Sequence, residues 1–195
     1  MPSQAYNLIK NSYQDDAPVI CLEHRWVHYA EGAIGEMGGK AESIEPVKLR
    51  SGDKLTLVSF GYLTLECLLV VDEYRKLGTE IELIDLQMIR PLKLDMVFES
   101  VKKTGHLMVV DQGSKFLGIG AEIVSQVVEN GLDCLERPPV RLGLPNLPSP
   151  SSRWLVGDYY CTSVDIALKV GEMLELKEIS AKALASVEWI RNENP

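Results

Sequence analysis

Two histidines and an arginine stand together directly after a short apolar run near the start of the chain. His24, Arg25 and His28 follow residues 19–22, which have the composition of a strand. An imidazole can act as a general base when a partner group and a substrate are positioned around it, and it can bind zinc beside further ligands at suitable spacing. The sequence shows neither arrangement. We therefore keep these residues as a candidate ligand or interface loop and predict no metal site.

Four further polar residues follow two apolar runs of strand length. Asp85 and Arg90 come after residues 81–84, and Asp111 and Gln112 come after residues 107–110. In an open parallel sheet, ligands collect beyond the carboxyl ends of the strands. Asp111 and Gln112 are thus candidates to contact a substrate or partner domain, but Asp111 could equally cap the following turn. For Asp85 and Arg90, an ion pair or a turn contact is favoured over a catalytic dyad.

A glycine pair opens the helix that is expected after this second polar turn. Gly118 and Gly120 could aim backbone N–H groups at a phosphate, helped by the positive end of the helix and by Lys115. The alternative is that glycine merely permits a tight connection from strand to helix, and a lone G-x-G favours that interpretation.

Bulk properties narrow the classes of function. Of the 195 residues, 46% are hydrophobic and 25% charged, as in a globular protein, and the net charge of −8 argues against nucleic-acid binding. The four cysteines have no C-x-x-C spacing, which favours a reducing cytoplasm over a zinc site or a disulfide framework. No apolar run reaches the roughly 18 residues that a membrane helix needs. The G-x-S-x-G, P-loop and H-E-x-x-H motifs are absent.

The elements that must position these residues alternate between strand and helix. We expect strands at residues 55–60, 81–84, 107–110 and 140–144, with helices at residues 62–77, 94–103 and 120–129 between them. Such alternation implies right-handed crossovers. The predicted fold class is a three-layer α/β/α domain with a mainly parallel, five-stranded mixed sheet.

The flanking segments complete the predicted organisation. Residues 1–30 hold one amphipathic helix and the strand-like run at 19–22, which cannot make a domain alone. Residues 31–50 are rich in glycine and charge, which predicts a linker that ends in a short edge strand. Residues 51–195 form the main domain. Its proline-rich stretch at 143–150 is expected to cross the surface, and two amphipathic helices follow it.

Several motifs, in order, resemble the C-terminal domain of the transketolase superfamily, and in particular the beta subunit of thiamine-diphosphate-dependent 2-oxo-acid dehydrogenases such as pyruvate dehydrogenase. The resemblance covers residues 2–173. The motifs are Asp16-Ala17-Pro18-Val19-Ile20 with Leu22-Glu23-His24-Arg25-Trp26, Ile84-Asp85-Leu86 with Ile89-Arg90-Pro91-Leu92, Glu99-Ser100-Val101-Lys102-Lys103-Thr104-Gly105, Gly120-Ala121-Glu122-Ile123, and Pro145-Asn146-Leu147-Pro148-Ser149-Pro150. One departure is Asp111-Gln112-Gly113, where many such beta subunits have His-Glu-Ala, so a role tied to that histidine does not transfer.

The resemblance also implies what this chain lacks. The family holds thiamine diphosphate and magnesium with a G-D-G motif, a downstream asparagine and a glutamate of the pyrimidine-binding domain, and we find none of these here. Residues 1–30 resemble the last helix and strand of that domain, whose remainder would add on the order of 150 residues. We therefore expect a fragment or a split-gene product that is inactive and cofactor-free by itself.

The resemblance names the expected companions of the chain. They are the missing pyrimidine domain, an alpha subunit or diphosphate-binding domain, a second copy of the chain in a homodimer, and an acyltransferase core. We expect no nucleic-acid or membrane partner. A partner-docking module and a small anion- or phosphate-binding domain are the alternative functions.

Overall fold

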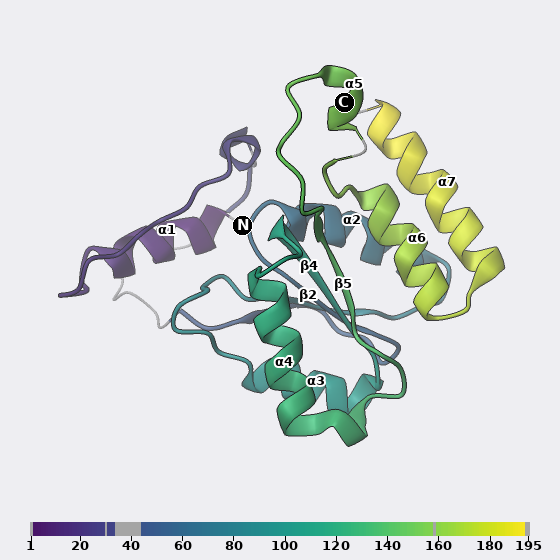
Figure 1. The fold of residues 1–195 in the computed structure, drawn as a ribbon, viewed down its shortest axis with the longest axis horizontal. Helices are drawn as coiled ribbons and strands as arrows, with labels where there is room; N and C mark the ends of the chain where they lie inside the picture. The colour runs from purple at the N-terminus through teal and green to yellow at the C-terminus, as the bar shows by residue number, and fades with distance from the viewer. Residues whose placement is uncertain (1, 30, 34–43, 158, 194–195) are drawn as a thin grey trace.

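A five-stranded mixed sheet forms the centre of the molecule (Figure 1). The computed structural model describes residues 2–29, 31–33, 44–157 and 159–193. The strands are β1 (Val47–Arg50), β2 (Thr56–Ser59), β3 (Glu82–Asp85), β4 (Leu107–Ser114) and β5 (Val140–Leu144), arranged in the order β1-β3-β2-β4-β5. Strands β2 to β5 are parallel, whereas the edge strand β1 runs antiparallel to β3. The predicted fold class is confirmed.

Helices cover both faces of the sheet (Figure 1). The longer helices of the domain are α2 (Leu63–Lys76), α3 (Asp95–Thr104), α4 (Ile119–Gly131), α6 (Ser163–Met173) and α7 (Lys177–Glu193). Side chains of α2, α6 and α7 form one buried cluster with alternate strand residues such as Leu57 and Val110, and α3 and α4 form a second cluster with the residues between them, such as Val58 and Val109. This alternation is what a parallel sheet buried on both faces requires.

Both edges of the sheet are short and interrupted. β1 follows Pro46 and has an irregular register between Lys48 and Arg50. The other edge strand, β5, follows Pro138 and Pro139 and ends directly before Pro145. Proline has no backbone N–H to donate, so it ends the ladder on each side.

The N-terminal segment differs from its prediction. Helix α1 (Pro2–Ser12) forms as expected, but residues 18–24 have no regular secondary structure, so the strand predicted at 19–22 is wrong for this structure. Ile20 and Leu22 are 85% and 84% exposed. An isolated strand cannot satisfy its backbone groups, because a ladder needs a neighbour and the described sheet offers none here. A 3-10 helix, η1 (Arg25–Tyr29), follows.

Three further features of the domain were not predicted. Strand β4 continues four residues beyond Val110, so part of the expected polar turn is a strand that pairs Ser114 with Leu144. A short helix, α5 (Arg153–Val156), follows the surface crossing at residues 143–150 and stands at the top of Figure 1. A 3-10 turn, η2 (Leu132–Cys134), follows α4. Of the linker predicted at 31–50, residues 34–43 lie outside the described part, and its end forms the expected edge strand β1.

Candidate functional site

The two candidate aspartates both lie at the carboxyl ends of strands, but their side chains are on opposite faces of the sheet. Ser59 at the end of β2 is in register with Asp85 on one side and with Val110 on the other. Side chains in register share a face, and neighbours along a strand point to opposite faces. Asp85 therefore faces α2, while Asp111 faces α4. The two carboxylates lie on opposite faces of the sheet and do not form one site.

Asp111 closes the connection between β4 and α4. Its Oδ1 accepts the N–H of Gly113 at 2.7 Å, and its Oδ2 accepts the N–H of Gly120 at 3.3 Å. The residue is only 6% exposed. A Cβ on Gly118 would lie 2.0 Å from the carbonyl oxygen of Ser114, so this position requires glycine for space. The carboxylate of Asp111 thus occupies the start of α4, which is the phosphate site that the sequence analysis raised for Gly118 and Gly120.

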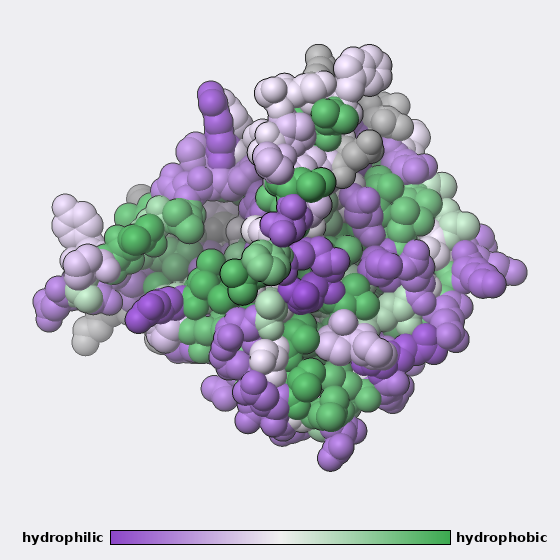
Figure 2. Space-filling model, viewed as in Figure 1, coloured by the Kyte–Doolittle hydropathy of each residue, from purple (hydrophilic) through white to green (hydrophobic). Residues whose placement is uncertain are grey.

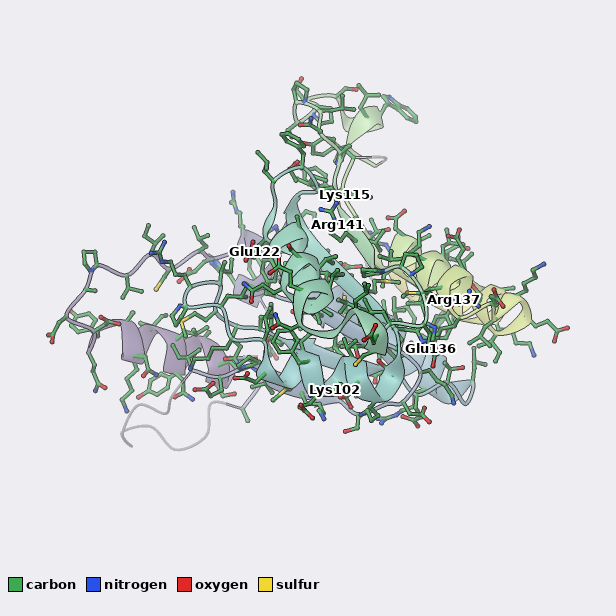
Figure 3. The ribbon with its side chains drawn as sticks, turned by 60° about the horizontal axis from the view of Figure 1, so that its bottom comes forward. Lys102, Lys115, Glu122, Glu136, Arg137 and Arg141 are labelled. Carbon is green, nitrogen blue, oxygen red and sulfur yellow. The ribbon has the colours of Figure 1, made fainter. Side chains whose placement is uncertain are left out.

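Lys115 is fixed through its backbone rather than through its ammonium group. Its N–H donates to the carbonyl of Leu144 at 2.9 Å, and its carbonyl accepts a hydrogen bond from Arg141 Nη1 at 2.7 Å. Figure 3 shows Lys115 and Arg141 together at one end of the β4–β5 pair. Gln112 lies beside the end of β2, where its Oε1 would be 3.7 Å from a Cβ on Gly61.

Asp85 is buried against the first turns of α2. It is 7% exposed, its Oδ1 accepts the N–H of Gln87 at 3.1 Å, and it is hydrogen-bonded to Thr64. Burial raises the pKa of this carboxyl above its ordinary value, although both hydrogen bonds oppose the shift. Arg90 is exposed and makes no ion pair with Asp85 within the described ranges. Asp85 thus takes the turn contact, without the ion pair.

His24 is the member of the N-terminal cluster that reaches the domain. Its ring stacks on Tyr62 with centroids 4.8 Å apart, and Trp26 lies edge-on to both rings. The N–H of Trp26 donates to His24 Nδ1 at 3.3 Å, which requires that nitrogen to be unprotonated. His28 pairs with Glu23 at 3.1 Å, and both side chains are more than half exposed. Arg25 is exposed.

A network around Glu66 was not predicted from the sequence. Glu66 accepts hydrogen bonds from Tyr62 Oη, from the N–H of Ser163 at 2.8 Å and from Arg191 Nη1 at 2.7 Å. Burial alone raises the pKa of Glu66, but these partners outweigh it, and the pKa lies below its ordinary value. No spacing pattern reveals this network, because it joins the starts of α2 and α6 to the end of α7.

The opposite, amino-terminal edge carries a cleft of about 560 Å³. Its lining includes Lys54, Lys103, His106 and Arg137, and Figure 3 shows Arg137 beside Glu136 away from Lys115. Lys54, Lys103 and Arg137 each pair with a carboxylate, of Asp53, Glu82 and Glu175 respectively. The cleft is therefore largely charge-balanced.

The described residues contain neither a cluster of metal ligands nor a helix that could span a membrane. No group of three or more His, Cys, Asp or Glu side chains there could hold a metal ion. No helix in that part of the chain is long and apolar enough to cross a membrane.

The sheet order and its two helical layers define an α/β domain with one antiparallel edge strand. The family described as "Transketolase, C-terminal domain" matches residues 44–165, and the chain belongs to this family. A solved structure described as a split gene transketolase, an inactive beta4 tetramer, superposes with a TM-score of 0.68 at 19% identity over 90% of this chain and 56% of that one. That likeness shows the fold.

The curated relatives that the chain matches include beta subunits of pyruvate dehydrogenase and of an acetoin oxidoreductase. The pyruvate dehydrogenase E1 component subunit beta of Rhizobium meliloti is 32% identical over 149 residues, covering 76% of this chain and 32% of the relative. The Bacillus subtilis subunit is 31% identical, covering 78% and 47%. The beta subunit of acetoin:2,6-dichlorophenolindophenol oxidoreductase from Cupriavidus necator is 31% identical, covering 85% and 50%. The chain therefore spans half the length of these relatives or less.

Proposed function

We propose that this chain is the C-terminal structural and assembly domain of a thiamine-diphosphate-dependent 2-oxo-acid dehydrogenase beta subunit or of a transketolase-like enzyme, without a complete active site of its own. The observation that carries the proposal is that the candidate polar side chains at the carboxyl ends of the strands make contacts within the fold. Asp111 closes a helix start, Asp85 closes a turn and His24 stacks on Tyr62. Each is engaged in holding the fold together.

The contacts also argue against assembly of these groups into a reaction centre. A general acid–base pair or a nucleophile with its base must lie within hydrogen-bond reach of one another. Asp85 and Asp111 lie on opposite faces, and the sheet backbone separates them. No hydrogen bond joins His24 to either aspartate in the described part of the chain, where its Nδ1 accepts the N–H of Trp26.

The cofactor of the full enzyme would be thiamine diphosphate with magnesium. The described residues do not fit this group, because the helix start that resembles an anion site is filled by the Asp111 carboxylate, which would repel a diphosphate. We therefore assign the cofactor site to companion elements: a pyrimidine-binding domain, and an alpha subunit or diphosphate-binding domain.

The division of the chain follows from the same proposal. Residues 1–30 would be the last helix of the pyrimidine-binding domain and the segment that forms a strand only when the rest of that domain is present, residues 31–50 the linker with its edge strand, and residues 51–195 the C-terminal domain. In support, α1 has no buried residue, and Ile20 and Leu22 expose most of their surface. Apolar side chains in such positions are expected to pack against the rest of their own domain.

A second candidate function, a partner-docking module, is favoured by the surface around α5. Leu147, Trp154 and Leu155 are 66%, 92% and 59% exposed. Figure 2 shows further apolar surface over the N-terminal extension and the lower end of α4. Candidate partners are a second copy of the chain and the acyltransferase core of a multienzyme complex, in a reducing cytoplasm. Light scattering after size exclusion, and capture on a purified acyltransferase core domain, test these two partners separately.

Titration calorimetry tests the main proposal directly. The purified chain is titrated with thiamine diphosphate in the presence of Mg²⁺ and assayed for 2-oxo-acid oxidation with an artificial electron acceptor. We expect neither binding nor turnover from the chain alone, and both on addition of the companion polypeptides. Turnover by the chain alone would contradict the proposal, as would companions that reach full activity equally well without the chain.

A further inference from the structure

The first turn of α2 joins two segments that are far apart in the sequence. On one side, the ring of Tyr62 stacks against His24 with an interplanar angle of 19°. On the other side, the hydroxyl of Tyr62 donates to Glu66, whose second oxygen lies 2.7 Å from Arg191 near the end of α7. An unbroken series of contacts therefore runs from the N-terminal segment to the C-terminal helix.

The position of Glu66 depends on all of its partners. Its side chain is 12% exposed, and it accepts hydrogen bonds from α2, from the start of α6 and from α7. Arg191 also contacts Ser163 Oγ at 3.2 Å, which fixes the guanidinium in turn. Removing one partner of a buried charge leaves the other uncompensated, so the remaining group moves toward water. If Glu66 shifts in this way, Tyr62 loses the acceptor that orients its ring.

Residues 25–29 have little else to hold them. No residue of η1 is buried, and Trp26 and Tyr29 are 64% and 85% exposed. The aromatic cluster of His24, Trp26 and Tyr62 supplies the ring contacts that the structure shows between this segment and the domain. The orientation of Tyr62 therefore decides whether the segment has a docking surface.

We propose that Tyr62 and Glu66 couple the seating of the last turn of α7 to the docking of residues 24–29 on the carboxyl edge of the sheet. While Arg191 binds Glu66, Glu66 accepts the Tyr62 hydroxyl, and the Tyr62 ring keeps the orientation in which it stacks on His24. A partner that draws the end of α7 away frees the N-terminal segment without touching it. This coupling is independent of the catalytic role of the full enzyme, since it needs only contacts within this chain.

Hydrogen exchange followed by mass spectrometry tests the coupling. The amides of Trp26 and Val27 donate to His24, at 3.3 Å to Nδ1 and 3.0 Å to the carbonyl, so their exchange reports whether the turn that holds the His24 ring against Tyr62 is formed. We expect Arg191→Ala to accelerate their exchange roughly tenfold or more, the ratio that loss of one hydrogen bond to a charged group produces in a local opening equilibrium. Wild-type exchange at both amides in Arg191→Ala would overturn the proposal.

A matched control and a second variant remove the ambiguity of general destabilisation. Arg137→Ala breaks the 2.8 Å ion pair with Glu175 just before α7, far from Tyr62, and should leave Trp26 and Val27 unchanged. Tyr62→Phe keeps the ring but removes the hydroxyl, and should accelerate the same two amides. If Arg191→Ala instead accelerates exchange throughout the chain, Tyr62→Phe decides: acceleration confined to residues 24–29 supports the coupling, and unchanged exchange overturns it.

Discussion

The carboxylate of Asp111 accepts the backbone N–H of Gly120 at 3.3 Å, across the turn that leads from β4 into α4. Its other oxygen binds Gly113, so one side chain fixes both ends of the connection. This arrangement is equivalent to a helix cap supplied from a preceding strand, and it combines a charge-assisted hydrogen bond with the positive end of the helix.

Asp111→Ala is expected to lower the free energy of unfolding by about 2 kcal/mol, because the N–H of Gly120 in the first turn of α4 and the N–H of Gly113 in β4 lose their acceptor. Urea denaturation of the purified chain measures the change. Asp133→Ala alters an exposed aspartate after the same helix and should stay within about 0.5 kcal/mol of wild type. Equal losses in the two variants would show that Asp111 has no special role as a cap.

Gly118→Ala should destabilise the chain by about 2 kcal/mol or more, because the added methyl group would lie 2.0 Å from the Ser114 carbonyl oxygen and the backbone must move. Thermal unfolding monitored by circular dichroism is suited to this comparison. Gly157 provides the matched control: it has helical φ and ψ angles, and no atom lies within 4 Å of its added Cβ. Gly157→Ala should be neutral or slightly stabilising. A well-tolerated Gly118→Ala would contradict the geometry of this turn.

Glu82 is expected to make the fold sensitive to acid. Its side chain is 1% exposed and lies between Lys103 and Lys48, the latter 3.2 Å away. Burial alone raises the pKa of Glu82, but the hydrogen bonds from Lys103 and Ser100 and the contact with Lys48 hold it below the ordinary value of 4.5. A carboxyl whose folded-state pKa is depressed contributes stability above its unfolded pKa, and this stability is lost as the pH falls through the folded pKa.

The free energy of unfolding should therefore decline as the pH is lowered below about 4.5, and Glu82→Gln should flatten that decline while costing about 2 kcal/mol or more at pH 7. Urea titrations at a series of pH values measure both effects. Glu99→Gln is the control, since Glu99 is 74% exposed in its pair with Lys102 and should change stability at pH 7 by less than about 0.5 kcal/mol. An unchanged pH slope in Glu82→Gln would rule out this carboxylate as a main source of acid sensitivity.

Asp85 should affect the pH dependence of stability in the opposite direction to Glu82. Burial raises its pKa, so the ionised form is disfavoured in the folded state, and stability is gained as the pH falls through that raised value. Asp85→Asn retains an oxygen that can accept the Gln87 N–H and removes the buried charge. We expect stability at pH 7 to be maintained or to rise by up to about 1 kcal/mol. A clear loss would indicate that the charge itself is needed.

The central fold could be predicted from the sequence because its signals are local. Apolar runs of strand length and helical periodicity placed β2, β3 and β5 and their helices to within a few residues, as the observed bounds show. The continuation of β4 to Ser114 could not be seen, because Asp111, Gln112 and Gly113 have low strand propensity. Pairing with β5 and the hydrogen bonds of Asp111 override that preference.

The candidate site was only partly accessible to sequence reasoning. The positions of Asp85 and Asp111 at strand ends followed from the pattern, but the opposite directions of their side chains follow from the register with Ser59, which depends on the whole sheet. The Glu66 network needs the docked positions of α6 and α7. For residues 19–22, composition indicated a strand, but a strand also needs a neighbour, and composition carries no information about that.

The prolines beside β5 and the irregular register of β1 have a consequence for how this chain meets other molecules. A free sheet edge invites neighbouring chains to add strands, and proline, bulges and short length all discourage this. Addition of a partner strand is therefore disfavoured at both edges of the sheet. The same features protect the isolated domain from fibril growth. A partner protein must therefore contact side chains on the helices and loops, and the identity of those side chains determines which partners bind.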